Sequence, residues 1–166
     1  MARLFRRRIS RTRRGTYAVR LPSEERALLA SLVDQLRELL EVTTDDPAVR
    51  RLFPTAYHDD AERDREYQQL VRDELLEHRL EALAVVEVTA KASELDEPQL
   101  TGWLTSLNDL RLVLGTRLDV SEEQDALDED DPDAPAMAVY GYLSVLLNDV
   151  VDALAEDLPP PTEPEM

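Results

Sequence analysis

Leucine at helical spacing is the pattern that most constrains how this chain of 166 residues can fold. Leu28, Leu32, Leu36 and Leu39 recur at every third or fourth position, which places them on one face of a helix. Similar apolar stripes follow, and only 4 glycines interrupt the chain. The pattern predicts four long helices, over about residues 23–42, 61–90, 97–118 and 136–157, and a short helical turn over about 48–52.

The second of these helices has apolar residues on two faces. Tyr67, Val71 and Leu75 lie on one face, and Leu76 and Leu80 lie on another. Because a helix that is apolar on two sides must be covered on both, we expect this helix to lie at the centre of the bundle.

The N-terminal segment has the pattern of a β-hairpin. Residues 4–9 and 16–21 are compatible with strands, and alternate residues from Tyr17 onward would share one face. Residues 10–15 would form the loop, with Gly15 free to adopt a positive φ. Because an isolated hairpin is only marginally stable in water, its apolar face should pack on the helices.

The sequence therefore predicts a mainly α fold, in which an N-terminal β-hairpin packs on a bundle of about four long helices plus short helical turns. We expect one domain over residues 1–157, since the length suits a single hydrophobic core. It would consist of an arginine-rich hairpin (1–21) and a helical bundle (22–157) with an acidic loop at 119–133. A disordered tail would follow at 158–166.

Charge is distributed very unevenly along the chain. The first 20 residues carry eight arginines and no acidic residue, whereas the remainder holds all 36 acidic residues, and the net charge is −17. Three interpretations stay open: an arm that contacts DNA or RNA phosphates, a hairpin that docks on an acidic protein, or a segment that folds back on the chain's own acidic residues. The candidate binding residues are Arg6, Arg7, Arg8, Arg11, Arg13 and Arg14.

The sequence offers no catalytic motif. It has no cysteine, which excludes disulfides, thiolate metal sites and thiol redox switches. It also lacks a Gly-x-Ser-x-Gly elbow and a glycine-rich phosphate loop. Glu74, His78 and Glu81 would lie on one side of a helix, but the Glu-x-x-His motifs of a carboxylate-bridged metal site are missing. We therefore expect no enzyme activity, no cofactor and no metal.

The chain carries no apparent membrane or export signal. No apolar run approaches the roughly 20 residues that a membrane-spanning helix needs. The basic residues Arg6, Arg7 and Arg8 are not followed by the apolar segment of a signal peptide. We expect a cytoplasmic protein with no membrane partner.

Arg111 is the most unusual residue of the predicted core, because it falls inside the apolar stripe of the third helix. A buried charge must be paired, and the second helix offers Glu74 and Glu81 beside His78. Asn108 lies on the same side of the third helix as Arg111. We expect these five residues to form a buried polar centre. Arg111 would make a structural ion pair there, the interpretation we favour, or hold a small anion or a partner's carboxylate.

Several strings of residues resemble a known family. They include Arg51-Leu52-Phe53-Pro54, Asn108-Asp109-Leu110-Arg111-Leu112 and Tyr140-Gly141-Tyr142-Leu143. With these strings the chain is similar to the actinobacterial domain-of-unknown-function family 2017, whose members are described as AosR-type oxidative stress transcriptional regulators. The similarity runs from the N-terminal strands to the last helix. It implies a small regulatory or adaptor protein with Asn108, Asp109 and Arg111 as a shared structural centre.

The resemblance also implies oxidant sensing through a redox-active cysteine pair, which this cysteine-free chain lacks. We expect a non-enzymatic, cytoplasmic regulatory protein that acts by protein–protein contact. Its partner would belong to the transcription machinery, and DNA could be contacted through the N-terminal arginines. The alternatives are an adaptor or homodimerisation module without a transcriptional role, and a small-anion sensor that uses Arg111.

Overall fold

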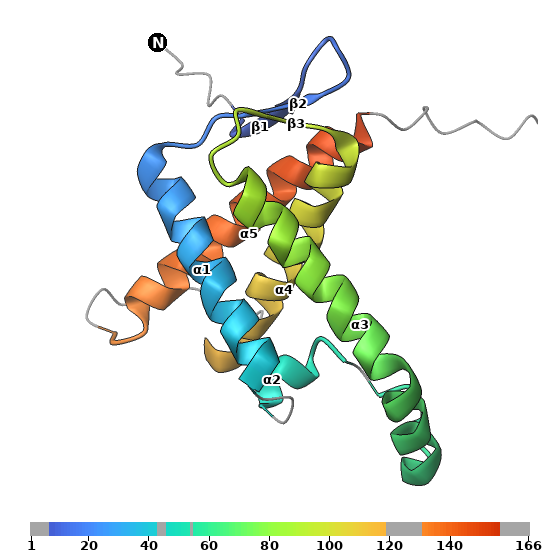
Figure 1. The fold of residues 1–166 in the computed structure, drawn as a ribbon. Helices are drawn as coiled ribbons and strands as arrows, with labels where there is room; N and C mark the ends of the chain where they lie inside the picture. The colour runs from blue at the N-terminus through green and yellow to red at the C-terminus, as the bar shows by residue number, and fades with distance from the viewer. Residues whose placement is uncertain (1–6, 43–45, 54, 119–130, 157–166) are drawn as a thin grey trace, which may run out of the picture.

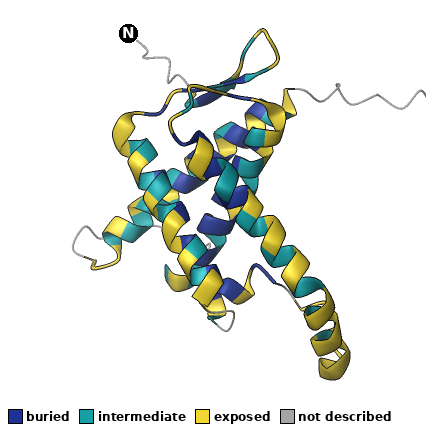
Figure 2. Ribbon diagram, in the orientation of Figure 1, coloured by how far each residue is buried: buried dark blue, intermediate teal, exposed yellow. Residues whose placement is uncertain are grey.

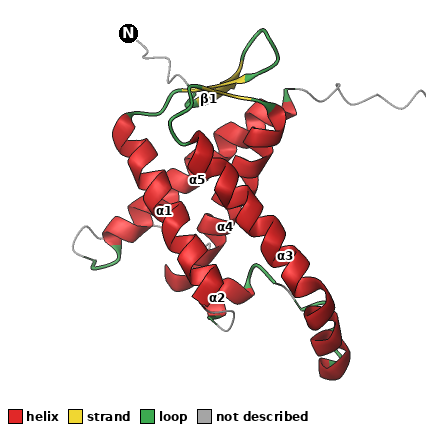
Figure 3. Cartoon of the chain, in the orientation of Figure 1, coloured by secondary structure: helices red, strands yellow, loops and turns green. Residues whose placement is uncertain are grey.

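The computed structural model of the chain describes residues 7–42, 46–53, 55–118 and 131–156. Along the chain the elements are β1 (Ile9–Arg11), β2 (Tyr17–Val19), α1 (Ser23–Val42), α2 (Pro47–Arg50), α3 (Ala61–Thr89), β3 (Glu94–Leu95), α4 (Glu97–Leu118) and α5 (Ala134–Ala155). Figure 1 shows a helical bundle with a small sheet across one end, and Figure 3 shows how little of the chain is strand. The predicted fold class, mainly α with an N-terminal hairpin packed on helices, is confirmed.

Local capping fixes the helix ends close to their predicted positions. α4 spans the predicted residues, and a capping box opens it: the Gln99 N–H donates to the Asp96 carboxylate (2.8 Å), and the Asp96 N–H donates to the Gln99 side chain (2.9 Å). Asp60 caps α3 by accepting from the Arg63 N–H (3.1 Å). Most of the predicted acidic loop, residues 119–130, and the predicted tail at 158–166 lie outside the described residues.

The sheet differs from the predicted hairpin in two ways. Its first strand spans Ile9–Arg11 and pairs with β2 in antiparallel register, Ile9 opposite Val19. Of residues 7–9, the described part of the strand predicted over 4–9, only Ile9 is in the strand, which continues to Arg11 in the predicted loop. The turn closes between Thr12 and Thr16, with Gly15 at the predicted positive φ (82°). β3 was not predicted, and it pairs with β2 so that Tyr17 lies opposite Leu95.

Arg26 of α1 joins the sheet to the bundle. Its guanidinium donates to the backbone carbonyls of Val19 and Leu21, at 3.1 and 3.0 Å, and to those of Ala90 and Ala92, at 2.9 and 2.8 Å. The last two carbonyls lie where α3 ends, and carbonyls at a helix C-terminus have no partner within the helix. One half-buried side chain therefore satisfies backbone groups of two segments that are far apart in the sequence, 19–21 and 90–92.

α4 is the central helix, and the prediction that α3 would be central is wrong. α4 contacts α1, α2, α3 and α5. α3 is 29 residues long against 22 for α4, so its N-terminal turns extend beyond the bundle, where Leu70 is 81% exposed. Figure 2 shows this end of α3 as almost entirely exposed. The apolar residues on two faces predicted that this helix would be buried along its length. In the structure the buried residues of α3 all lie in its C-terminal half.

Two glycines of α4 set its distance from the neighbouring helices. A Cβ on Gly102 would lie 2.9 Å from a methyl group of Val85 in α3, and one on Gly115 would lie 3.0 Å from the Tyr140 ring in α5. Between these contacts the buried Trp103 indole donates to the Thr89 hydroxyl (2.7 Å), which links α4 to the end of α3.

α5 is more apolar than the sequence analysis expected. Among the described residues it is the one helix that is long and apolar enough to cross a membrane by length and composition, with a mean hydropathy of 1.3 over its best 18 residues. The expectation that no segment approaches this limit is therefore corrected. Leu143, Leu146 and Val150 of α5 are buried in the core, and the helix contacts α4 and β1.

Candidate functional site

The ion pair between Arg79 and Asp109 lies at the centre of the candidate site. Asp109, on α4, is 1% exposed and accepts a hydrogen bond from the Arg79 guanidinium of α3. Arg79 also donates to the backbone carbonyl of Leu52 (3.0 Å), and its guanidinium carbon lies 5.8 Å from the centre of the Phe53 ring. The pair thereby ties α3, α4 and the segment after α2 together.

The charge of Asp109 is held against a strong desolvation penalty. Burial raises the pKa of the Asp109 carboxyl, while the hydrogen bond from Arg79 and the positive charge of Arg79 oppose the rise. Only one carboxylate oxygen, Oδ1, is bonded to Arg79. The other, Oδ2, is buried and has no hydrogen-bond partner among the described residues.

An open groove of about 480 Å³ passes over this ion pair, between α3, α4 and α5. Its apolar side chains come from all three helices, and its polar ones from α3 and α4. The lining residues are Leu75, His78, Arg79, Leu104, Thr105, Asn108, Asp109, Leu147 and Val151. A groove of this composition offers apolar contact along three helices, with the exposed side chains of His78 and Asn108 beside it for hydrogen bonding.

The predicted buried polar centre around Arg111 is wrong. Arg111 is half-buried and stacks on the Tyr140 ring of α5, with its guanidinium carbon 5.6 Å from the ring centre. No carboxylate of the described residues forms an ion pair with it. Glu74, His78, Glu81 and Asn108 are exposed. The helical wheel placed Arg111 in the stripe correctly, but its long side chain reaches an aromatic face at the rim of the core instead of a carboxylate inside it.

Two of these predicted residues nevertheless border the same groove. His78 and Asn108 line the groove, whereas Glu74 and Glu81 do not. Sequence reasoning missed Arg79 and did not select Asp109 as a site residue on its own evidence. The signal was available: Asp109 shares a face of α4 with Gly102, Ser106 and Val113, and a small and apolar face of this kind indicates contact with another helix.

Arg8 is held by the chain's own acidic residues. Its guanidinium forms a two-bond pair with Glu25 of α1, at 3.0 and 3.1 Å, and its backbone N–H donates to Asp149 of α5 (3.0 Å). The Tyr142 hydroxyl donates to the same Glu25 carboxylate (2.9 Å). The hydrogen bond from Arg8 lowers the pKa of Glu25, whereas burial and then the bond to Glu25 raise the pKa of Tyr142.

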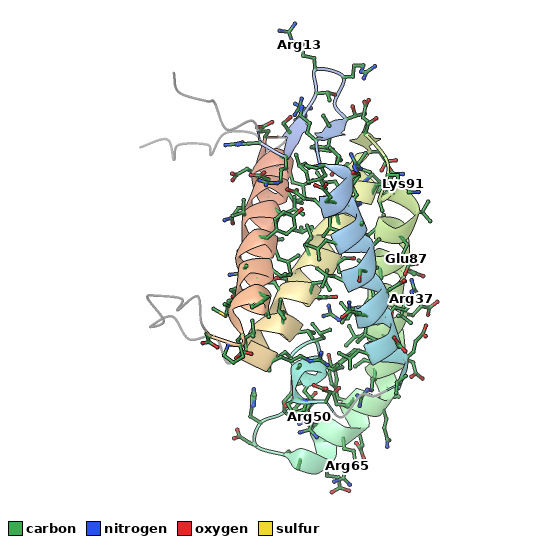
Figure 4. All side chains as sticks on the ribbon, turned by 90° about the vertical axis from the view of Figure 1, so that its left-hand side faces the viewer. Arg13, Arg37, Arg50, Arg65, Glu87 and Lys91 are labelled. Carbon is green, nitrogen blue, oxygen red and sulfur yellow. The ribbon has the colours of Figure 1, made fainter. Side chains whose placement is uncertain are left out.

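The other candidate arginines divide into paired and projecting ones. Arg7 lies 3.7 Å from Asp152 and 3.5 Å from Glu156, and Arg14 lies 3.0 Å from Glu94. Arg13 is exposed and points away from the body at the hairpin tip (Figure 4). Arg11 also has an interaction partner, and Arg6 lies outside the described residues. Of the three interpretations, these contacts favour the one in which the segment folds back on the chain's own acids.

Within the described ranges no group of three or more His, Asp or Glu side chains is arranged to hold a metal ion. Glu74, His78 and Glu81 accordingly do not converge with residues of another helix.

Comparison with known proteins gives a family and no further relative. No curated protein and no solved structure matches the chain. The family model for a domain of unknown function, DUF2017, matches residues 3–154. This range holds the sheet, the groove with its Arg79–Asp109 pair, and nearly all of the last helix. The chain therefore belongs to the DUF2017 family.

Proposed function

We propose that this protein is a non-enzymatic, cytoplasmic regulatory protein that acts by docking a partner protein in the groove between α3, α4 and α5. The observation that carries the proposal is the composition of the groove. Leu75, Leu104, Leu147 and Val151 supply apolar contacts along three helices, and the exposed His78 and Asn108 supply hydrogen-bonding groups beside them. A groove between helices is a common binding site for an amphipathic helix.

The charge near the groove favours a basic partner segment. Glu74 and Glu81 lie one helical turn to either side of His78, are exposed, and form no ion pair with the described residues. A partner helix with an apolar face and flanking lysine or arginine residues would match the groove and this rim.

A transcriptional role is part of the proposal through the resemblance to AosR-type regulators. The partner would then be a component of the transcription machinery. Direct DNA binding through the N-terminal arginines is the weaker alternative, because Arg7, Arg8 and Arg14 are already paired with carboxylates of the same chain. Oxidant sensing through a thiol has no residue to carry it in this cysteine-free chain.

Two valines of α5 provide a matched test. Val151 lines the groove and is 46% exposed, whereas Val145 is 50% exposed and lies outside the groove lining. Partners are captured with the wild-type chain and with V151D and V145D, and each partner is then purified and titrated by calorimetry. We expect a partner whose affinity falls at least tenfold with V151D and stays unchanged with V145D. A partner that binds all three proteins equally, or an equal loss in both variants, contradicts docking in the groove.

A further inference from the structure

A second hollow lies at the end of the molecule opposite the sheet. It has a volume of about 410 Å³, and its lining includes Arg50, Phe53, Thr55, Asp64, Arg65 and Arg72. Arg50 comes from α2, whereas Arg65 and Arg72 come from the N-terminal half of α3. Figure 4 labels Arg50 and Arg65 at this end, far from the arginine-bearing hairpin tip. Three guanidinium groups from two helices thus border one hollow.

This clustering stands out in a chain with 36 acidic and 19 basic residues. Two other arginines, by contrast, meet carboxylates: Arg37 meets Glu87 (2.7 Å) and Arg117 meets Asp46 (3.5 Å). The guanidinium groups of Arg50 and Arg65 form no ion pair or hydrogen bond with the described residues. Their positive charges therefore remain available to an anion.

Asp64 is the single carboxylate in the lining, and the loop before α3 engages it. Its Oδ1 accepts hydrogen bonds from the backbone N–H groups of Ala56 (2.8 Å) and Tyr57 (3.2 Å). Asp64 thereby has a structural role at the edge of the hollow. With three arginines and one aspartate in the lining, the formal charge of the hollow is +2.

Arg72 is held in place by an aromatic ring. Its guanidinium carbon lies 5.4 Å from the centre of the Phe53 ring, and Phe53 is itself buried, with Arg79 at 5.8 Å from the same ring. A guanidinium stacked on a ring has lost much of its freedom and presents its positive charge in a fixed place. Arg72 is therefore oriented before any ligand arrives.

We propose that this hollow binds a phosphate group, carried by a small molecule or by a phosphorylated side chain. A phosphate monoester has a charge of about −1.5 to −2 at pH 7 and oxygens that match the planar fork of arginine. Arg50 and Arg65 provide guanidinium groups that have no partner among the described residues, and Arg72 adds an oriented positive charge. This inference is independent of the groove between α3, α4 and α5.

The test is calorimetric titration of the full chain with pyrophosphate at constant ionic strength, with R50Q and R65Q as variants. Removing one charge-assisted contact weakens binding by about tenfold. The matched control is R51Q, because Arg51 is the exposed neighbour of Arg50 and does not line the hollow. D64N removes the one negative charge of the lining and should strengthen binding. Circular dichroism confirms that each variant is folded.

Each outcome decides the proposal. Binding that is weakened by R50Q and R65Q, kept by R51Q and strengthened by D64N supports the site. No binding by the wild-type chain overturns it, and so does an equal loss in R51Q, which would indicate attraction to net charge alone. Once the site is supported, titration with inorganic phosphate and with O-phosphoserine identifies the carrier. Tighter binding of O-phosphoserine indicates a phosphorylated side chain, and tighter binding of inorganic phosphate indicates a free phosphate compound.

Discussion

Asp109 occupies a position where a helical bundle normally places an apolar side chain. Ser106 and Val113, which share its face of α4, are buried with it. A carboxylate in this environment is stable only when a cation reaches it, and Arg79 does so from α3 while also bonding the Leu52 carbonyl. The carboxylate whose burial costs desolvation energy thus lies on α4, and the cation that compensates this cost comes from α3.

Replacing Arg79 by methionine leaves Asp109 buried and unpaired. We expect R79M to lower the free energy of unfolding by about 3–5 kcal/mol, because breaking one side of a buried ion pair exposes the full desolvation cost of the other. Urea denaturation at pH 7 measures the change. In the double variant R79M/D109L no charge remains buried, so most of the stability should return. A double variant as unstable as R79M would show that the loss came from packing.

The pair of Arg8 and Glu25 makes stability depend on pH. The hydrogen bond from Arg8 lowers the pKa of Glu25 in the folded state, so the ionised carboxylate stabilises the fold. That contribution is complete above the ordinary glutamate pKa of about 4.3 and is lost as the pH falls through the lower, folded-state pKa. We expect wild type to be about 1 kcal/mol more stable than E25Q at pH 7 and to lose this advantage on acidification. Urea denaturation of both proteins between pH 7 and pH 3 tests this, and a difference that does not change with pH contradicts it.

The same residues mark the limit of prediction from sequence. The helical wheel correctly identified a charged residue in an apolar stripe, but it could not tell where a flexible side chain ends. Arg111 ends on the Tyr140 ring, whereas the shorter Asp109 cannot leave the core. Whether α3 presents Arg79 opposite Asp109 depends on the rotation of two helices relative to each other, which no single-helix pattern contains.

At the scale of elements, two glycines of α4 allow this helix to lie close to α3 and α5. Gly102 and Gly115 face Val85 and Tyr140 at distances that leave little room for a side chain. Because protein interiors are close-packed, an added methyl group at such a position must displace a neighbour. The spacing of three helices is therefore set by two residues that have no side chain.

Alanine substitutions at two glycines should have opposite effects. G102A places a Cβ 2.9 Å from a Val85 methyl group, and we expect it to destabilise the protein by about 1–3 kcal/mol. G141A lies in α5, where an added Cβ meets nothing within 4 Å, so the better helix propensity of alanine should stabilise by up to about 1 kcal/mol. Thermal and urea denaturation of both variants measure the difference. Equal effects would mean that the seam between α3 and α4 adjusts without cost.

Elements governed by local interactions were predictable, and those governed by long-range pairing were not. Asp96, Gln99 and Pro98 mark the start of α4 within four residues of sequence. β3 contains only Glu94 and Leu95 and exists because β2 lies beside it. A two-residue strand has no periodicity of its own to detect, so the sequence indicated a break between helices and nothing more.

At the scale of the whole molecule, the basic N-terminal segment forms part of the core. Ile9 and Tyr17 are fully buried, and Val19 is nearly so. Around them, Arg7, Arg8 and Arg14 contact acidic residues of α1, α5 and β3. Three of the eight arginines in the first 20 residues are therefore neutralised by carboxylates of the same chain.

Deletion of residues 1–20 should destabilise the protein severely. Each large apolar side chain that is fully buried contributes about 1.5–3 kcal/mol, and the deletion removes Ile9 and Tyr17 along with the pairing partner of β3. R13Q, at the exposed hairpin tip, serves as the control and should leave the melting temperature unchanged. A truncated protein that melts at the wild-type temperature would show that the sheet adds nothing to stability.

The full chain should not bind duplex DNA at physiological salt. A net charge of −17 repels phosphates, and three of the candidate arginines are paired within the chain. Fluorescence anisotropy with a labelled generic duplex, from low to physiological salt, measures this. The prediction is contradicted if the chain binds the duplex with submicromolar affinity at physiological salt and loses this binding when Arg11, Arg13 and Arg14 are replaced by glutamine. That result would favour the interpretation of the N-terminal segment as an arm that contacts nucleic acid.

The position of β2 between β1 and β3 also has a consequence for the order of folding during synthesis. The N-terminal hairpin leaves the ribosome before the helices, but β2 gains its second strand partner only with β3, and Arg8 gains Tyr142 and Asp149 only when α5 has emerged. Domains generally fold once all the contacts of their core are available. Residues of the hairpin are thus made before the helices and yet are among the last to find their places, and the nascent chain presents this basic segment to its surroundings until its own acidic helices arrive.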